Sequence, residues 1–208
     1  PKIVNFWPVL KLIGNLISRK HACGVLGEGL HYTYDANGNQ SGQTDPKGNV
    51  TSFTYDEFGR RLTRTLPAVG GSTVTESWTY DDQGRTETHV DFKGQTTAYD
   101  YDTGTAHGGR LNNEYRFATG ATVFNGSHVL QTGNAAENTS YGYDDLGRPT
   151  SVDEYTGATQ TRHTGYIYNE FTGSVKQVDS PEGTINYEYY DDTARLKRMY
   201  TSSNDTRY

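Results

Sequence analysis

The stretch VTSFTYDEFGRRLTRT, residues 50–65, decides the fold. Phe53 and Tyr55 alternate with small polar residues, which places both aromatic side chains on one face of a β-strand. Asp56 suits the first position of a type I turn, and Gly59 suits the left-handed position that follows it. The residues after Gly59 can return as the partner strand. The stretch therefore predicts a β-hairpin that is closed by an Asp-x-x-Gly turn.

The same pattern of an aromatic residue, a spacer, a tyrosine and a turn-forming residue recurs from residue 31 onward. The tyrosines before the turns are 21, 25, 21, 42, 25 and 22 residues apart, namely Tyr34, Tyr55, Tyr80, Tyr101, Tyr143, Tyr168 and Tyr190. A fixed period of about 20 to 50 residues indicates a repeat architecture. The interval of 42 is twice 21 and predicts a degenerate copy between residues 104 and 140.

Further turns lie between the turns that follow the repeat tyrosines, so that turns occur about every ten or eleven residues where the repeat is regular. Turns at this spacing predict an up-and-down antiparallel sheet of short strands. The predicted turn residues are Asp35 with Gly38, Asp45 with Gly48, Asp56 with Gly59, Asp81 with Gly84, Asp91 with Gly94, and Asp144 with Gly147, and Ser180-Pro181-Glu182-Gly183 is a variant. The repeat aromatics are expected to form ladders along one sheet face that is concave toward a cavity: Tyr34, Phe53, Tyr55, Trp78, Tyr80, Tyr99, Tyr101, Tyr141, Tyr143, Tyr166 and Tyr168.

The degenerate copy keeps features of β-structure. Residues 122–124 and 128–130 flank Asn125-Gly126, the strongest short hairpin signal in the chain. Residues 106–110 and 133–138 are interpreted as loops. The region around 104–140 is therefore expected to be the irregular part of a repeat region that spans residues 31–208.

The composition changes along the chain. Leu, Ile, Val and Phe together number 35 of 208 residues, and 12 of the 35 lie in residues 1–30, which hold none of the 17 Tyr and 29 Thr. So low an apolar fraction is typical of disorder when net charge is high. The net charge of −6 is small for this length, and the aromatic content is 12%. The repeat region is thus predicted to be an ordered sheet whose apolar unit is tyrosine.

Residues 1–30 form a separate apolar segment. Apolar residues recur at helical spacing after Pro8, which predicts a short amphipathic helix that packs on the body of the protein. Its uncharged runs are shorter than the ~18 residues that span a membrane. A secretory signal or a lipid anchor at Cys23 is an alternative, although Lys11 interrupts the apolar run and Lys20 does not suit the lipid-anchor pattern. A remnant of an incomplete chain end is a third, and Pro rather than Met as the first residue favours a fragment or a processed piece.

The sequence predicts no catalytic residue, no metal site and no bound cofactor. The acidic pairs at 81–82, 144–145 and 191–192 recur at one turn position, which favours turn formation over acid–base chemistry. The six histidines are not closely paired, and the sequence lacks H-E-x-x-H, G-x-S-x-G and phosphate-binding glycine motifs. The pI near 5.5 gives no electrostatic reason to expect nucleic acid or an anionic membrane as a partner.

The motifs at 53–62, 78–85 and 141–148 closely resemble the YD repeat of the Rhs family. The resemblance covers about residues 31–200. Departures from the pattern are Asn39 in place of Arg, a missing turn residue in Asp102-Thr103-Gly104, Asn169 in place of Asp, and Ala194 in place of Gly.

The resemblance implies a long strip of antiparallel hairpins that curves and spirals into a hollow shell. In bacterial Rhs proteins and the C subunits of insecticidal toxin complexes, such a shell encloses a toxic C-terminal polypeptide. In teneurins, a related shell belongs to a cell-surface adhesion receptor. The implied function of this chain is a non-enzymatic structural segment of a shell that encapsulates and helps deliver a C-terminal toxin in interbacterial competition.

The implied partners are the remaining repeats and the toxin domain of the same polyprotein, together with secretion-apparatus proteins or cell-surface glycans. The implied location is secreted or on the bacterial cell surface, after a cytoplasmic stage.

A carbohydrate- or cell-surface-binding module is the alternative function. Exposed Tyr and Trp rings among Asp, Asn and Arg can stack on sugar rings while their polar tips bind hydroxyl groups. This alternative predicts a shallow groove with solvent-exposed rings. An enzyme would instead need a pocket that joins a histidine to carboxylates from different repeats.

Overall fold

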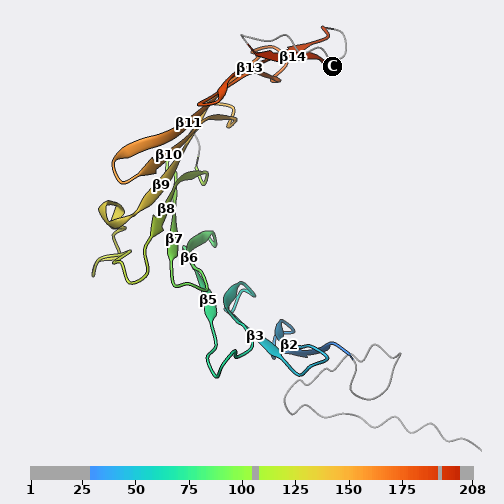
Figure 1. Ribbon diagram of the computed structural model, residues 1–208, viewed down its shortest axis with the longest axis vertical. Coiled ribbons are helices and arrows are strands. Elements are labelled where there is room, and N and C mark those ends of the chain that lie inside the picture. The colour runs from blue at the N-terminus through green and yellow to red at the C-terminus, as the bar shows by residue number, and fades with distance from the viewer. Residues whose placement is uncertain (1–28, 105–107, 192–193, 202–208) are drawn as a thin grey trace, which may run out of the picture. The chain divides into compact units, whose positions relative to one another are not determined.

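The computed structural model describes residues 29–104, 108–191 and 194–201, which form antiparallel β-strands joined by turns (Figure 1). The chain divides into two compact units, residues 1–79 and 80–208. The described residues contain no α-helix and one short 3-10 turn, η1 at Thr132–Asn134. The helix predicted after Pro8 lies outside the described residues. The all-β prediction of repeated antiparallel hairpins is confirmed.

The first unit is a meander in which each strand pairs with the next strand in the chain. Its strands are β1 (His31–Tyr34), β2 (Gln40–Thr44), β3 (Val50–Tyr55), β4 (Arg61–Thr65) and most of β5 (Thr75–Tyr80). Phe53 pairs with Arg64, and Arg64 pairs with Glu76, so aromatic and charged side chains share one face.

The second unit continues as a meander of nine strands. These are β6 (Thr86–Val90), β7 (Thr96–Tyr101), β8 (Leu111–Phe117), β9 (Glu137–Tyr143), β10 (Pro149–Thr156), β11 (Thr159–Tyr168), β12 (Val175–Ser180), β13 (Gly183–Tyr189) and β14 (Leu196–Thr201). From β6 to β14, each strand is antiparallel to its sequence neighbours.

Two faces of the second unit follow from this register. One face carries the cross-strand row Tyr99, Glu114, Thr139 and Glu154, and strand alternation adds Tyr101, Tyr141, Tyr143, Tyr166 and Tyr168. We call it the aromatic face. The opposite face, called the reverse face, carries the row Thr88, Ala98, Tyr115, Asn138 and Tyr155.

The register slips by one residue beside the turns that follow the repeat tyrosines. The slips lie at Thr33/Tyr34, Thr54/Tyr55, Asp100/Tyr101, Ile167/Tyr168 and Glu188/Tyr189, and in the β9–β10 pair at Pro149/Ser151. A left-handed glycine after a type I turn produces such a bulge. Each bulge bends its strand and increases the local twist. The repeat therefore contains a bend in the strand next to its turn.

Almost no apolar side chain is fully buried. Among the described residues, only Ala98 and Phe117 form a buried apolar core, at 0% and 1% exposure. Glu76 and Thr88 are buried polar residues. The rest of the sheet is a single layer with half-buried faces, which agrees with the scarcity of Leu, Ile, Val and Phe in the repeat region.

The region around 104–140 contains a regular strand that the sequence reading did not identify. β8 occupies Leu111–Phe117, and it pairs with β7 along its length and with β9 from Asn113 to Arg116. The irregular segment is residues 118–136, which leaves the end of β8 and contains η1 (Figure 1). Segments 122–124 and 128–130, expected as hairpin strands, form a single bridge between Phe124 and Leu130.

Candidate functional site: the repeat turns and the contacts between them

The turn at Asp144 shows how each repeat is closed. The Asp144 N–H donates to the Arg148 carbonyl at 3.0 Å, and the Gly147 N–H donates to the Asp144 carbonyl at 2.8 Å. Asp144 Oδ1 accepts the Leu146 and Arg148 N–H groups at 3.0 and 2.9 Å. Gly147 has φ +82°, the left-handed region that favours glycine. One carboxylate therefore satisfies two backbone donors that the turn leaves without a backbone partner.

The same geometry recurs at the predicted turns. Side-chain Oδ1 accepts two N–H groups, two and four residues ahead, at Asp35, Asp45, Asp56, Asp81 and Asp91. The glycines of these turns all have positive φ, namely Gly38, Gly48, Gly59, Gly84 and Gly94.

An arginine directly after the turn glycine completes the unit. Arg148 Nε lies 2.6 Å from Asp144 Oδ2, and the corresponding Asp56–Arg60 and Asp81–Arg85 distances are 2.6 and 2.7 Å. Asn39, which departs from the repeat pattern, donates instead from Nδ2 to Asp35 Oδ2 at 3.0 Å.

These arginines lower the pKa of the turn carboxylates. At Asp144, burial raises the pKa, but the backbone and side-chain hydrogen bonds from Arg148, with its charge, outweigh burial and leave the pKa below its ordinary value. The same balance lowers the pKa of Asp56 and Asp81. At Asp35 the side-chain hydrogen bond from Asn39 is the largest contribution to a lowered pKa.

The arginine also contacts the tyrosine of the following repeat. The guanidinium carbons of Arg85, Arg110 and Arg148 lie 4.3, 5.5 and 4.4 Å from the ring centroids of Tyr101, Tyr143 and Tyr168, respectively. A guanidinium over an aromatic face is attracted by the ring quadrupole. Each tyrosine hydroxyl donates to the carbonyl that follows this arginine in the chain: Thr86 at 2.9 Å, Leu111 at 3.0 Å and Pro149 at 2.7 Å. Consecutive repeats are thus joined by a stack and a hydrogen bond.

Burial raises the pKa of both Tyr101 and Tyr168. Their hydroxyls therefore remain protonated well above neutral pH and act as donors.

The turn glycine has a second role, because it lies against the arginine of the preceding repeat. A Cβ at Gly109 would lie 3.5 Å from Arg85 Nη1, and one at Gly173 would lie 3.6 Å from Arg148 Nη1. At Gly147 a Cβ would lie 2.9 Å from Arg110 Nη1, with Nη2 and Cζ closer still. We call this combination of contacts the repeat latch. In one example, Asp144, Gly147 and Arg148 of one turn contact Tyr168, which precedes the next turn, and Gly173 within that turn.

The structure corrects how the departures from the repeat were aligned. Asp102 pairs with Gly109 and Arg110 rather than with Gly104: the Gly109 N–H donates to the Asp102 carbonyl at 2.9 Å, and Gly109 has φ +91°. The turn of Asp102 is therefore complete, and the sequence between Asp102 and Gly109 is longer than in the other turns, where the sequence suggested a missing residue.

Asn125-Gly126 does not form the two-residue hairpin turn that was expected. Asn125 takes the place of the turn aspartate, and its Oδ1 accepts the Ser127 and Val129 N–H groups, both at 2.9 Å. His128 takes the place of the glycine, with φ +58°. In this register the Asn125 side chain satisfies two backbone donors, so the degenerate copy keeps the turn geometry of the other repeats.

The last copy is shifted by one residue from its predicted position. Tyr190 occupies the place of the aspartate, since the Ala194 N–H donates to its carbonyl at 3.0 Å and its N–H donates to the Arg195 carbonyl at 2.9 Å. Ala194, with φ +51°, stands in the place of glycine. Tyr189 is therefore the tyrosine that precedes this turn.

The sequence reading did not identify the latch arginines as functional residues. A signal was present, because Arg60, Arg85, Arg110 and Arg148 each stand directly after a glycine of the left-handed turn position.

Substitution of Arg148 should show how much the repeat latch contributes to the free energy of unfolding. We expect Arg148→Ala to lower the free energy of unfolding by about 1 to 2 kcal/mol, because it removes an ion pair and a cation–π contact at once. Arg148→Lys should recover only part of this loss, since an ammonium group lacks the planar surface that stacks on Tyr168. Urea unfolding followed by circular dichroism gives the values. Arg162→Ala is the matched control, because Arg162 is exposed and pairs only peripherally with Glu182 at 3.2 Å; equal losses for both variants would contradict the latch.

The lowered pKa values of the turn aspartates predict a pH dependence. Because the folded pKa lies below the unfolded one, these groups stabilise the fold above the ordinary value of 3.8, and the contribution is lost as pH falls through the folded pKa. We expect the free energy of unfolding to change little between about pH 7 and 5 and to decline below about pH 4. Asp144→Asn should decline less over this range, and a wild-type profile that stays level down to about pH 3 would oppose the prediction.

Two searches of the described residues are negative. They contain no helix that is long and apolar enough to cross a membrane. They also contain no group of three or more His, Cys, Asp or Glu side chains arranged to hold a metal ion.

Comparison with known proteins shows the same fold in larger assemblies. Residues 34–73 match the RHS Repeat family model, and no curated protein sequence matches the chain. The chain is similar to the Photorhabdus luminescens Tc holotoxin pore carrying the TccC3-D651A mutation, with a TM-score of 0.63, 19% identity, and coverage of 86% of this chain and 9% of that one. It is also similar to TcdB2-TccC3-Cdc42 (TM-score 0.61, 19% identity, 86% and 10% coverage) and to TcdB2-TccC3 without its hypervariable C-terminal region (TM-score 0.58, 20% identity, 86% and 9% coverage).

The chain spans about a tenth of the length of those chains. The match at residues 34–73 identifies an RHS repeat in this chain, and its recurring Tyr-Asp turns and shared sheet architecture make the chain similar to YD-repeat proteins.

Proposed function

We propose that this chain is a wall segment of an Rhs-type shell that encloses a C-terminal toxin polypeptide and helps to deliver it in competition between bacteria. The observation that carries the proposal is the repeat latch, which joins each hairpin to the next through Arg85–Tyr101, Arg110–Tyr143 and Arg148–Tyr168. A repeated hairpin cannot bury its aromatic face alone, so links between neighbours extend a continuous sheet. The fold shared with TcdB2-TccC3 supports the same role.

The bulges support a curved wall. Bulges recur beside the turns that follow the repeat tyrosines, and bulges are the features by which β-sheets are bent. The aromatic face is half-buried and carries hydroxyl groups and ion pairs, including Arg116 with Glu114. Such a face suits the wall of a wet or polar interior better than the core of a globular domain.

The proposed role requires no catalytic step from this chain. Its repeat aspartates, such as Asp56, Asp81 and Asp144, serve in turns. Its proposed partners are other repeats and the toxin domain of the same polypeptide. Export from the cytoplasm to the outside or surface of a bacterium belongs to the same proposal.

Electron microscopy of the complete gene product would test this function. We expect a closed, hollow β-shell that contains additional density, and we expect the sequence after Tyr208 to encode further repeats and a variable domain. Limited proteolysis should leave the enclosed part intact until the shell is denatured. An open strip without enclosed density, or a C-terminal part that is cleaved at the rate of a free peptide, would contradict the proposal. A deletion of residues 31–208 should also abolish killing of competitor bacteria in mixed culture.

A further inference from the structure

The turn at residues 125–129 lies at the tip of the irregular segment 118–136 and has no role in the repeat latch. All of its residues are exposed. The Asn125 N–H donates to the Val129 carbonyl at 3.0 Å, and the His128 N–H donates to the Asn125 carbonyl at 2.9 Å. The turn is therefore closed by backbone hydrogen bonds and is open to water.

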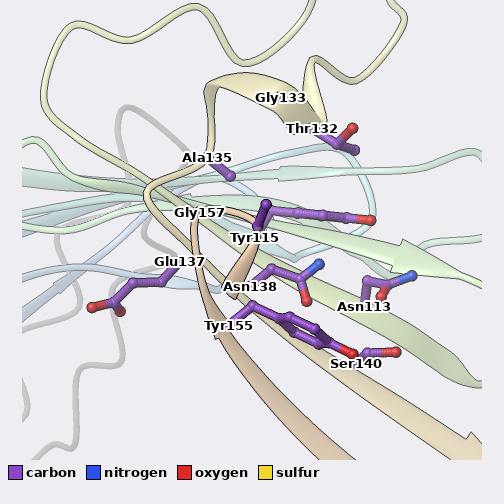
Figure 2. Close-up of a pocket in the computed structure, with 11 residues that line it drawn as sticks. Asn113, Tyr115, Thr132, Gly133, Ala135, Glu137, Asn138, Ser140, Tyr155 and Gly157 are labelled. Carbon is purple, nitrogen blue, oxygen red and sulfur yellow. The ribbon is translucent and has the colours of Figure 1, made fainter. Parts of the chain in front are cut away.

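Contacts outside the turn hold it in place. The His128 ring stacks on the Phe124 ring with 4.3 Å between the ring centroids, and His128 Nε2 lies 2.7 Å from Glu87 Oε1 on β6. On the returning arm of the segment, Ala135 lies beside Gly157 of the β10–β11 turn (Figure 2). The segment is thus attached on both sides of its tip, and the geometry at Asn125 belongs to the fold.

Asn125 is followed by Gly126, and asparagine side chains are chemically labile in water. The backbone nitrogen of the following residue can attack the side-chain carbonyl carbon, and a glycine has no side chain that hinders the attack. The sequence contains two Asn-Gly pairs, Asn37-Gly38 and Asn125-Gly126. Both asparagines are exposed, so the local hydrogen bonds decide how fast each one reacts.

The hydrogen bonds at Asn125 favour this attack. Asn125 Oδ1 accepts the Ser127 and Val129 N–H groups, both at 2.9 Å. Negative charge develops on this oxygen when the Gly126 nitrogen bonds to Cγ, and backbone donors that already point at the oxygen stabilise that charge, as in an oxyanion hole. Within the described part of the chain, neither the Gly126 N–H nor Asn125 Nδ2 makes a hydrogen bond. The attacking nitrogen and the leaving amide nitrogen are therefore both open to water.

Two other asparagines each have only part of this arrangement. Asn37 is followed by glycine, but its side chain makes no hydrogen bond to the residues that the structure describes. The Gly38 N–H also donates to the Asp35 carbonyl at 3.1 Å, which occupies the attacking nitrogen. Asn169 Oδ1 accepts two backbone N–H groups at 2.9 and 3.0 Å, but a glutamate follows Asn169. Of the three, only Asn125 has both the donors and the glycine.

We propose that Asn125 is a site of spontaneous conversion to aspartate and isoaspartate. The Gly126 N–H loses its proton to water, the nitrogen bonds to Asn125 Cγ, and the Cγ–Nδ2 bond breaks to release ammonia. A water molecule then opens the succinimide ring. Breakage of the new bond between Cγ and nitrogen gives aspartate with an ordinary backbone. Breakage of the original peptide bond gives isoaspartate, in which the main chain runs through the side-chain carbon.

The two products should differ in their effect on the turn. Aspartate is the residue that the regular repeats have at this position, and Asp56 Oδ1 accepts two backbone N–H groups in the same way. Isoaspartate lengthens the backbone and shortens the side chain, so its carboxylate cannot keep both hydrogen bonds of Asn125. His128 would then lose its position beside Glu87. Isoaspartate, and not aspartate, should therefore release the tip of the segment from β6.

Peptide mapping by mass spectrometry on the full 208-residue chain tests the site. Folded protein and protein in urea are incubated in parallel at mildly alkaline pH, in water enriched in heavy oxygen, which labels each new carboxylate. In the folded protein, we expect Asn125 to convert about tenfold or more faster than Asn37, because its oxygen is bound by two donors. Asn169 should stay unconverted. In urea, Asn125 should slow to a rate similar to that of Asn37.

Gly126→Ala is the matched variant. Gly126 is outside the left-handed region, and a Cβ there would meet no atom within 4 Å. The turn should therefore stay folded while conversion at Asn125 falls severalfold. Hydrogen exchange of the Val129 N–H should be no faster in Asn125→Asp than in the wild type, and faster in protein that carries isoaspartate.

Three results would overturn the proposal: a folded-state rate at Asn125 no higher than that of Asn37, a rate at Asn125 that rises in urea, or an unchanged rate in Gly126→Ala. None of them would affect the proposed shell, which depends on the aromatic face and the latch.

Discussion

Gly147→Ala should lower the free energy of unfolding of the second unit by about 2 to 3 kcal/mol. Two costs combine at this position. An alanine at φ +82° costs about 1 to 2 kcal/mol in the left-handed region. Its Cβ would also collide with the guanidinium group of Arg110, which occupies the space over Gly147. Arg110 can escape only by leaving its position near the Tyr143 ring, and the loss of that contact adds about 1 kcal/mol.

Gly120→Ala is the matched control for the backbone cost. Gly120 has φ +79°, close to that of Gly147, but a Cβ at Gly120 would meet no atom within 4 Å. Urea unfolding of both variants should therefore show a clear excess loss for Gly147→Ala. Equal losses would mean that Arg110 moves aside freely, and the latch would then contribute little.

A double-mutant cycle with Arg110→Ala assigns the excess to the arginine. In the Arg110→Ala background, the cost of Gly147→Ala should fall to that of Gly120→Ala, because the colliding group is gone. A coupling energy near zero would contradict the contact. The cycle also tests whether the turn glycines of this chain are needed because they leave space for the arginine as well as for their backbone conformation.

The strand and turn pattern could be predicted from the sequence because it depends on local chemistry. An Asp that accepts two backbone N–H groups and a Gly at positive φ are needed by the turn itself, so they recur wherever the turn recurs. The sequence was misleading where residues other than Asp and Gly occupy these turn positions. Asn125 and His128 form the standard turn although Asn-Gly is the stronger hairpin signal, and Gly109 rather than Gly104 closes the turn of Asp102.

The latch could not be predicted from one hairpin, because its partners belong to different repeats. The distance in sequence from Arg110 to Tyr143 is larger than that from Arg148 to Tyr168, since the irregular segment 118–136 lies between the first pair. Only the paired strands show that Arg110 contacts Tyr143 in the same way as Arg148 contacts Tyr168.

Phe117→Ala should have the largest effect on stability, a loss of about 3 to 4 kcal/mol. Phe117 is 1% exposed, and it is the only large side chain that is fully buried among the described residues. It lies at the end of β8, opposite Thr96 of β7, where the irregular segment 118–136 begins. Thr119 Oγ1 donates to the Lys93 carbonyl at 3.0 Å, which holds the start of this segment against the β6–β7 turn. Removal of the phenyl ring would leave a cavity at the start of segment 118–136, in which no side chain is buried.

Phe171→Ala is the matched control, since Phe171 is 96% exposed at the tip of a repeat turn and should change stability by less than about 0.5 kcal/mol. The contrast tests how a chain so poor in aliphatic residues remains ordered. If Phe117→Ala cost no more than Phe171→Ala, the latches alone would hold the sheet, and residues 118–136 would be a dispensable insertion. If it costs several times more, the irregular copy contributes a small core of its own.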